Sequence, residues 1–478
     1  MTYGKGMEKN KQHPPVVYAL LAALVAIIVK THIGTNTGLL ALMWAIASGQ
    51  LLLSRGAIIP ALDSSGLDKR QTKRAWAASC YGNWNTNEML AAWQRHAKEK
   101  CGWKALEHGG YSVIVADMVG IFRPKLKDCP SKHHDNTAGK ALPAIELGMI
   151  AQIGAINGKR QALLCKLIRV PAATKHSHKA LKDELIKQIC SLQGSKEIAV
   201  FDREFKAHEV LKYGSGYFVV RATSNATFCR SSKKLKASKL GRPTSKRTKV
   251  RPLPHKYKSN ISKADTPDEI KETELTIEHI NPKTGEIRQE KLTVIAEIWR
   301  DLRITDDTLK SMKLAEAEQQ RIYDTPLTLM VIKHPEFKTP MILVSNVPDP
   351  LLHLDKIYVD RWPIEGIPQT GKLVLGGQRE FVHNREHCQR LPELVLLTGN
   401  VLATVAAAHP AIPTGFWDKL PKSTSGRLRR LLFKVGCMPE IVLPDRIREK
   451  NSCAAHLVTG HAARLLKKPK LMPTDRGI

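Results

Sequence analysis

The pattern of hydrophobic and polar positions predicts a helical start to the chain. Residues 14–105 carry apolar runs at helical spacing, separated by a basic joint at 69–74. The longest run, 16–29, would form a helix about 21 Å long, which is shorter than the roughly 30 Å hydrocarbon core of a bilayer. Lys5, Lys9 and Lys11 resemble the basic start of a signal peptide, but no clear cleavage site follows them. We therefore expect a buried helix, with a signal or membrane segment as the alternative.

After residue 110 the pattern changes to short strands. β-rich runs at 111–117, 197–201 and 217–221 alternate with helical patterns at 177–192 and 205–213. Residues 144–156 and 161–170 flank Asn157-Gly158, a strong short-range signal for a hairpin. A hairpin combined with strand–helix–strand crossovers predicts an α/β protein with a mixed sheet and helices on its faces.

A second group of strands follows at 275–280, 291–299, 325–333 and 341–345, and the first two flank a turn-rich stretch at 281–286. From 352 to 409 the pattern is helical, and after 412 it is helical in pieces and basic. We expect four parts: a helical part at 1–105, a core at 106–225 and 341–411, a β insertion at 226–340, and a basic helical end at 412–478. The length of 478 residues fits two to four domains.

The charge balance narrows the class of partner. The chain holds 75 Lys and Arg against 44 Asp and Glu, a net charge of +31. Such a field favours nucleic acid as a partner first and an acidic membrane surface second. Residues 230–263 hold 13 Lys and Arg and no acid. Two interpretations are open for this segment: a solvated loop, or a segment that binds along the phosphates of DNA.

Cysteine and histidine usage offers little sign of a metal or disulfide framework. The nine cysteines are odd in number and none forms a C-x-x-C pair, which fits a reducing cytoplasm. His133-His134-Asp135 and His176-x-His178 are the remaining candidate metal ligands. Because no cysteine is spaced to complete a zinc site with them, we expect ordinary loop residues there.

Two acids and one polar segment carry the candidate chemistry. Asp117 and Asp202 end predicted strands, where open α/β sheets place their sites, although a lone aspartate there is commonly a turn former. At about 100° per residue, Tyr358, Arg361, Glu365 and Lys372 would lie within roughly 60° of one another on one helix. The alternative is a salt-bridged surface helix, since Arg361 and Glu365 are four residues apart.

The spacing Tyr-x2-Arg-x3-Glu-x6-Lys at 358–372 resembles the signature of a large family of DDE transposases from bacterial insertion sequences. Asp202-Arg203-Glu204-Phe205 is similar to the second-aspartate motif of that family, and Asp117 to the first aspartate. The resemblance covers about residues 1–410. It implies an RNase H-like mixed-sheet core interrupted by a β-stranded insertion, with a helical N-terminal DNA-binding domain.

The resemblance also implies roles for single residues. Asp117, Asp202 and Glu365 would form a catalytic triad that holds two Mg²⁺ ions, with Mn²⁺ able to substitute. Tyr358, Arg361 and Lys372 would contact DNA phosphates, with Arg203 beside them. Trp299, the only tryptophan of the insertion, would stack on a flipped base or, alternatively, would be a packed strand residue. Pro368 would interrupt the helix that carries these residues.

By the same resemblance, the protein would bind the terminal inverted repeats of a mobile element, cut the DNA and transfer its ends to target DNA. Its partners would be double-stranded DNA and a second copy of the chain, without a membrane. It would act in the bacterial cytoplasm, at the nucleoid. The alternative is a catalytically inactive, transposase-derived DNA-binding protein, which would bind DNA without metal-dependent cleavage.

Overall fold

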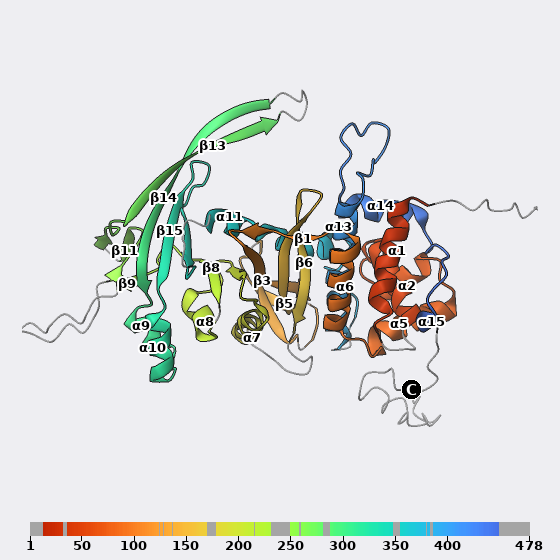
Figure 1. The fold of residues 1–478 in the computed structure, drawn as a ribbon. Coiled ribbons are helices and arrows are strands. Elements are labelled where there is room, and N and C mark those ends of the chain that lie inside the picture. Colours follow the sequence, from red (N-terminus) through yellow and green to blue (C-terminus); the bar gives the residue numbers. More distant parts are fainter. Residues whose placement is uncertain are drawn as a thin grey trace, which may run out of the picture. The chain divides into compact units, whose positions relative to one another are not determined.

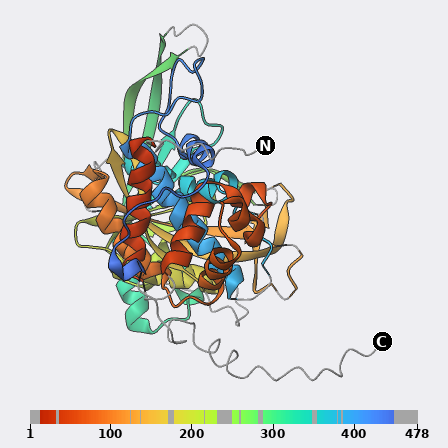
Figure 2. The same ribbon diagram turned by 90° about the vertical axis from the view of Figure 1, so that its right-hand side faces the viewer.

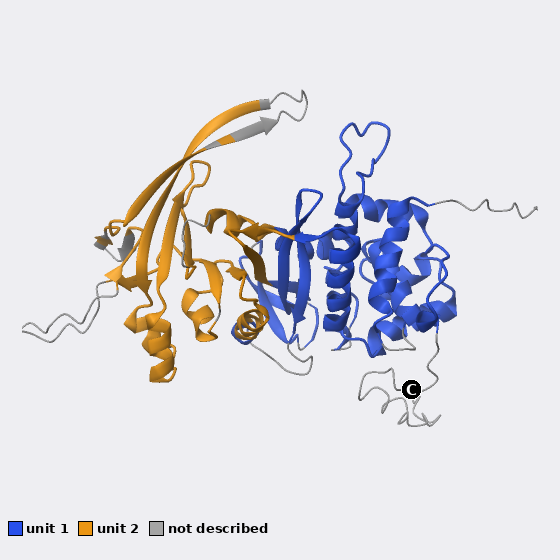
Figure 3. Ribbon diagram, viewed as in Figure 1, with its two compact units in different colours: residues 1–104, 118–181, 363–478 blue, residues 105–117, 182–362 orange. Residues whose placement is uncertain are grey.

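The computed structural model describes residues 13–31, 36–123, 125–127, 129–135, 137–169, 178–214, 216–230, 249–257, 260–280, 287–347, 354–378, 380–382 and 386–448. The chain forms two compact units (Figure 3). Unit 1 comprises 1–104, 118–181 and 363–478, and unit 2 comprises 105–117 and 182–362. Strand β3 (Tyr111–Phe122) contributes its first part to unit 2 and its last part to unit 1.

The N-terminal part of unit 1 is helical, as predicted (Figure 1). Its helices are α1 (Pro15–Ile28), α2 (Asn36–Ala47), α3 (Gln50–Leu53), α4 (Ile58–Ser64), α5 (Lys69–Tyr81) and α6 (Thr86–Lys100). The apolar run at 16–29 forms α1, whose buried side chains pack against α2, α6 and α13 (His387–Ala408). The expectation of a buried helix there is confirmed.

Helix α13 is the centre of unit 1, whose helices face the viewer in Figure 2. Within the described residues it is the one helix long and apolar enough to cross a membrane, but 89% of its apolar window is buried inside the protein. That burial is typical of a core helix. It packs against α1, α2, α5, α6 and two strands, so the N- and C-terminal parts of the chain share one core. The compact units therefore differ from the four expected parts.

A buried asparagine links the layers of that core. Asn400 on α13 accepts hydrogen bonds from the indole Nε1 of Trp93 (2.9 Å) and the backbone N–H of Leu164 (3.1 Å). Its side-chain amide donates to the carbonyl of Ala162 (2.8 Å). One side chain thus satisfies polar groups of α6 and of the sheet, which is what buried polar groups require.

The strands of unit 1 form an antiparallel meander of β4 (Ser131–Asp135), β5 (Lys140–Ile156) and β6 (Lys159–Ile168). Asn157 and Gly158 connect β5 to β6 with φ values of 49° and 74°. Positive φ at both positions is the geometry that Asn-Gly favours in two-residue hairpins. The predicted hairpin is confirmed. The remaining elements of this unit are α12 (Gly366–Gln369), the π-helix η2 (Thr370–Val374), α14 (Ser425–Val435) and α15 (Asp445–Arg448).

Unit 2 is built on a mixed sheet in the order β3-β7-β8-β16-β15-β14-β9-β10. β3, β7 and β8 are parallel, and the pairs from β8 onward are antiparallel. The strands are β2 (Glu107–His108), β7 (Glu197–Phe201), β8 (Tyr217–Arg221), β9 (Phe228–Arg230), β10 (Lys249–Val250), β13 (Glu269–Ile280), β14 (Ile287–Arg303), β15 (Leu327–Lys333) and β16 (Met341–Ser345). A separate pair consists of β11 (His255–Tyr257) and β12 (Asn260–Ser262). The α/β class with a mixed sheet is confirmed.

Helices α7 (His178–Leu192) and α8 (Ala207–Lys212) lie where the pattern predicted them. β13 and β14 pair over their length as a long hairpin, whose predicted turn at 281–286 lies outside the described residues. The stretch between β14 and β15 was expected to contain only strands and connections. It contains α9 (Asp306–Ser311) and α10 (Glu316–Asp324). Thr305 caps α9 by accepting the N–H of Thr308, which is a typical helix start.

Candidate functional site

The register of two parallel strands places the two candidate aspartates at corresponding positions along β3 and β7. β3 and β7 pair from Ser112–Glu197 to Val115–Val200. Asp117 and Asp202 each follow the last pair by two residues, so they continue the same register on neighbouring strands. The two acids therefore occupy corresponding positions, Asp117 within β3 and Asp202 directly after β7.

Only one of the two aspartates ends its strand. Asp202 directly follows β7, as predicted. The prediction that Asp117 ends a strand is wrong, because β3 continues to Phe122. The strand continues into unit 1 through apolar residues whose side chains are buried there: Met118, Val119 and Ile121.

Arg361 lies against the first aspartate. Its Nη1 is 3.5 Å from Oδ2 of Asp117, and the two side chains are 7% and 19% exposed. The guanidinium carbon also lies 5.7 Å from the ring centroid of Tyr358. Of the Tyr-Arg-Glu-Lys signature, Arg361 therefore contacts the first acid within unit 2, and Tyr358 lies beside Arg361. Tyr358 and Arg361 are both buried, so in this structure they support the acid rather than offer a surface to DNA.

Asp360 was not identified from the sequence. Its Oδ2 lies 2.6 Å from Nε2 of His108, and the pair joins the end of α11 (Leu354–Val359) to β2. Because these residues are about 250 positions apart, no local pattern could have indicated the contact. The pair helps to position the segment that carries Arg361.

Asp202 also acts as a turn former. Its Oδ1 accepts the backbone N–H of Glu204 at 2.8 Å. A carboxylate offers about four acceptor positions. The turn bond is therefore compatible with metal binding by the same group. Both interpretations made from the sequence remain consistent with this geometry.

The prediction of one continuous helix through the signature is wrong. The segment consists of α11, a turn at 360–361, the 3₁₀-helix η1 (Trp362–Glu365), α12 and the π-helix η2. Pro363 and Pro368 lack the N–H that a regular α-helix would use, which explains the irregular path. Glu365 is exposed and belongs to unit 1. The helical-wheel argument for a single face therefore does not hold.

Lys372 directly precedes two residues that line a basic groove of unit 1. Its Nζ is 6.0 Å from the ring centroid of Phe122. The next residues of η2, Leu373 and Val374, line a groove of about 370 Å³. The other lining residues are Leu52, Thr424, Gly426, Arg427, Arg429 and Arg430. The groove thus joins the signature segment to the basic α14.

The cations of this groove differ in their partners. Arg427 forms an ion pair with Asp418 at 2.8 Å. Neither Arg429 nor Arg430 forms an ion pair within the described residues. Burial, and after it the charge of Arg430, lowers the pKa of Arg429 below its usual value. An anion in the groove would relieve that repulsion, and phosphate suits arginine in particular.

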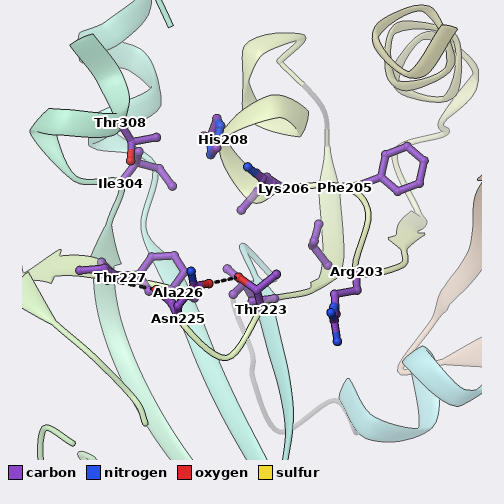
Figure 4. A pocket seen from close by; sticks show the side chains of 15 residues that line it. Arg203, Phe205, Lys206, His208, Thr223, Asn225, Ala226, Thr227, Ile304 and Thr308 are labelled. Carbon is purple, nitrogen blue, oxygen red and sulfur yellow. Dashed lines mark hydrogen bonds between the residues drawn. The ribbon is translucent and has the colours of Figure 1, made fainter. Parts of the chain in front are cut away.

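Two further predicted DNA contacts differ in accessibility. Trp299 on β14 is fully buried, so the expected stacking on a flipped base is not possible in this structure. The packed-strand alternative is correct, because the residue sits on the covered face of the sheet. Arg203 is exposed and lines a cavity of about 180 Å³ together with Lys206 and His208 (Figure 4). Burial lowers the pKa of His208, so its imidazole is neutral near pH 7.

The basic run at 230–263 is described only at its ends, since 231–248 lie outside the described residues. Arg230 pairs with Asp268 at 2.7 Å, and Lys249 pairs with Asp307 at 2.9 Å. These two cations thus belong to local ion pairs of the insertion.

No protein-family model matches the chain, and no curated protein is found to match it.

Proposed function

We propose that this protein is a DDE transposase that binds the terminal inverted repeats of a mobile element, cleaves DNA and transfers the ends to target DNA. The observation that carries the proposal is the register of β3 with β7, in which Asp117 and Asp202 both follow the Val115–Val200 pair by two residues, with Arg361 of the signature segment against Asp117. The mixed sheet and the net charge of +31 support an RNase H-like core acting on DNA.

The carboxylates of Asp117, Asp202 and Glu365 are the proposed ligands of two Mg²⁺ ions, with Mn²⁺ able to substitute. Carboxylate oxygens are the ligands that Mg²⁺ prefers, and the donor set therefore fits the metal. Two-metal sites supply an activated oxygen nucleophile and stabilise the leaving oxygen at phosphorus. Arg361 positions Asp117, and Tyr358 positions Arg361 through its ring.

The cations hold the substrate. Lys372 and the groove arginines of α14 bind the phosphate backbone, and Arg203 contacts it next to Asp202. Such contacts are not specific for sequence, and they fix the position of the scissile phosphate. Two transposon ends have to be held together for strand transfer, so the active form is a homodimer on DNA. The protein acts at the nucleoid in the cytoplasm.

The proposal is tested by cleavage of a labelled duplex that spans one end of the mobile element and its flanking DNA. Wild type is compared with Glu365→Gln and Asp202→Asn in the presence of Mg²⁺. Asp355→Asn is the matched control. Like the two triad variants it removes one negative charge, but Asp355 lies on α11 and is not part of the proposed triad. Wild type and the control should cut at the element boundary, and the two triad variants should not.

Two outcomes contradict the proposal in different ways. If the triad variants cut as well as wild type, the assigned acids are not the catalytic ones. If no protein cuts and all of them still shift the duplex in a gel, the chain is the inactive DNA-binding alternative. Binding and cleavage are therefore measured on the same duplex.

A further inference from the structure

A second group of metal-ligating side chains lies in unit 1, apart from the proposed triad. It consists of His133 on β4, Glu146 on β5 and His178 at the start of α7. Nδ1 of His133 is 3.0 Å from Oε1 of Glu146, and Nδ1 of His178 is 2.6 Å from the same oxygen. One donor atom from each residue lies within 4.8 Å of the other two. Three separate elements thus converge on one carboxylate.

The carboxylate of Glu146 is unusual in its burial. Its side chain has no exposed surface, and its Oε2 has no hydrogen-bond partner within the described residues. A buried carboxylate oxygen without a partner is costly and calls for a ligand.

The surroundings orient one histidine toward Glu146. A Cβ added at Gly120 of β3 would lie 2.5 Å from the ring of His133. The ring can occupy its position because residue 120 has no side chain. His134, the next residue of β4, is exposed, and Asp135 caps a turn by accepting the N–H groups of 137 and 138. Of the His-His-Asp motif, only His133 therefore belongs to the cluster.

We propose that His133, Glu146 and His178 form a zinc site, with water completing the coordination. Two imidazoles and one carboxylate plus water are a ligand set that Zn²⁺ accepts, whereas Mg²⁺ prefers oxygen ligands alone. Zn²⁺ bond lengths near 2.1 Å place tetrahedral donors about 3.4 Å apart, so each histidine nitrogen has to move away from Oε1 of Glu146 by less than about 1 Å. The histidine side chains are 22% and 38% exposed, which gives an ion access from solvent.

The ion would have a structural role. Glu146 and His178 are 32 residues apart in the chain, and the ion would tie the first turn of α7 to the β4–β5 pair. A cross-link that closes a chain of this length removes conformational freedom from the unfolded protein. The site is independent of DNA cleavage.

The test is a Co²⁺ titration of the full-length protein after treatment with a chelator, because Co²⁺ replaces Zn²⁺ and its visible absorption reports the geometry of its ligands. Wild type should take up one equivalent, lose the absorption when Zn²⁺ is added and retain it in excess Mg²⁺. His178→Ala and Glu146→Gln should lose the absorption, and His134→Ala should retain it. His178→Ala changes a partly exposed residue, so it keeps the test valid if Glu146→Gln fails to fold.

The proposal is overturned if wild type shows no such absorption, or if His178→Ala and Glu146→Gln absorb as wild type does. The second result would assign the ion to other groups, such as the cysteines of the chain. Since no DNA is present in the titration, its failure leaves the proposed transposase activity unaffected. Failure of DNA cleavage would likewise leave the zinc site in place.

Discussion

Asn400 provides a quantitative test of how the core of unit 1 is held together. The change Asn400→Leu keeps a side chain of similar size but removes three hydrogen bonds, to Trp93, Leu164 and Ala162. Each buried group left without a partner costs about 1–3 kcal/mol, so the sum is about 3–9 kcal/mol. Proteins are stable by about 5–15 kcal/mol in total. We therefore expect the variant to lose a large part of the stability of unit 1.

The same helix offers a matched control. Thr398 is also fully buried, but its hydroxyl has no hydrogen-bond partner within the described residues. Thr398→Val removes that hydroxyl at nearly constant shape. Because no bond is lost, the change should be neutral or stabilising by up to about 1 kcal/mol. The two variants differ in hydrogen bonding and share the same burial.

Two measurements check this prediction. Urea unfolding followed by circular dichroism gives the shift of the midpoint for each variant. Hydrogen exchange of the peptide 159–168 reports the amide of Leu164, which should exchange faster in Asn400→Leu than in wild type. The reasoning is refuted if Asn400→Leu costs less than about 1 kcal/mol or if it shifts the midpoint no more than Thr398→Val does.

Three further predictions concern charge, pH and the buried tryptophan. Replacing Arg429 and Arg430 by Gln should weaken DNA binding and reduce the slope of log affinity against log salt by about 2, whereas Lys310→Gln on α9 should leave the slope nearly unchanged in a titration at several salt concentrations. Burial, followed by the charges of nearby arginines, lowers the pKa of His387 to about 4. The folded state then binds fewer protons than the unfolded state below pH 6.5, so stability is lost as pH falls toward 4, by about 1.4 kcal/mol per pH unit. His387→Asn should remove this loss in urea unfolding at several pH values, and parallel curves for both proteins would contradict the assignment. Trp299→Phe should leave the affinity for the duplex of the proposed cleavage test unchanged in a gel-shift titration, whereas a stacking role would cost about 1–3 kcal/mol.

Local signals predicted much of the fold. Asn157-Gly158 marked a hairpin because only a few residues accept positive φ at both turn positions. β7 and β8 lie at the predicted residues, since each is a short apolar run bounded by polar residues. α1 is buried as its apolar run suggested. These features depend on neighbours in the sequence, which is why the sequence alone reveals them.

Features that depend on distant contacts were missed or misplaced. The helical-wheel argument assumed a regular helix through Pro363 and Pro368, whereas the structure changes helix type between them. The contact of Arg361 with Asp117 joins residues far apart in the chain. The partnership of Glu146 with two histidines depends on the pairing of strands and on the start of a helix. No spacing rule could have indicated these contacts.

The candidate site was predicted in part. Asp202 directly follows its strand as expected, and the register of β3 with β7 aligns Asp117 with it. For Trp299 the sequence left two alternatives open, because residue type says nothing of which face of a strand is covered, and its burial supports the packed-strand alternative. The sequence indicated that the C-terminal part is basic, but it did not indicate a groove, since the shape of the groove depends on the packing of α14 near η2.

The central position of α13 also affects how the protein is made. The helices before residue 104 need α13, which ends at residue 408, to cover their apolar faces. At about 5–20 residues per second, a ribosome takes on the order of 15–60 s to synthesise the intervening chain. During that time the N-terminal helices have no partner that completes their core. Prematurely terminated chains should therefore aggregate or be degraded, and only complete translation products should accumulate as folded protein.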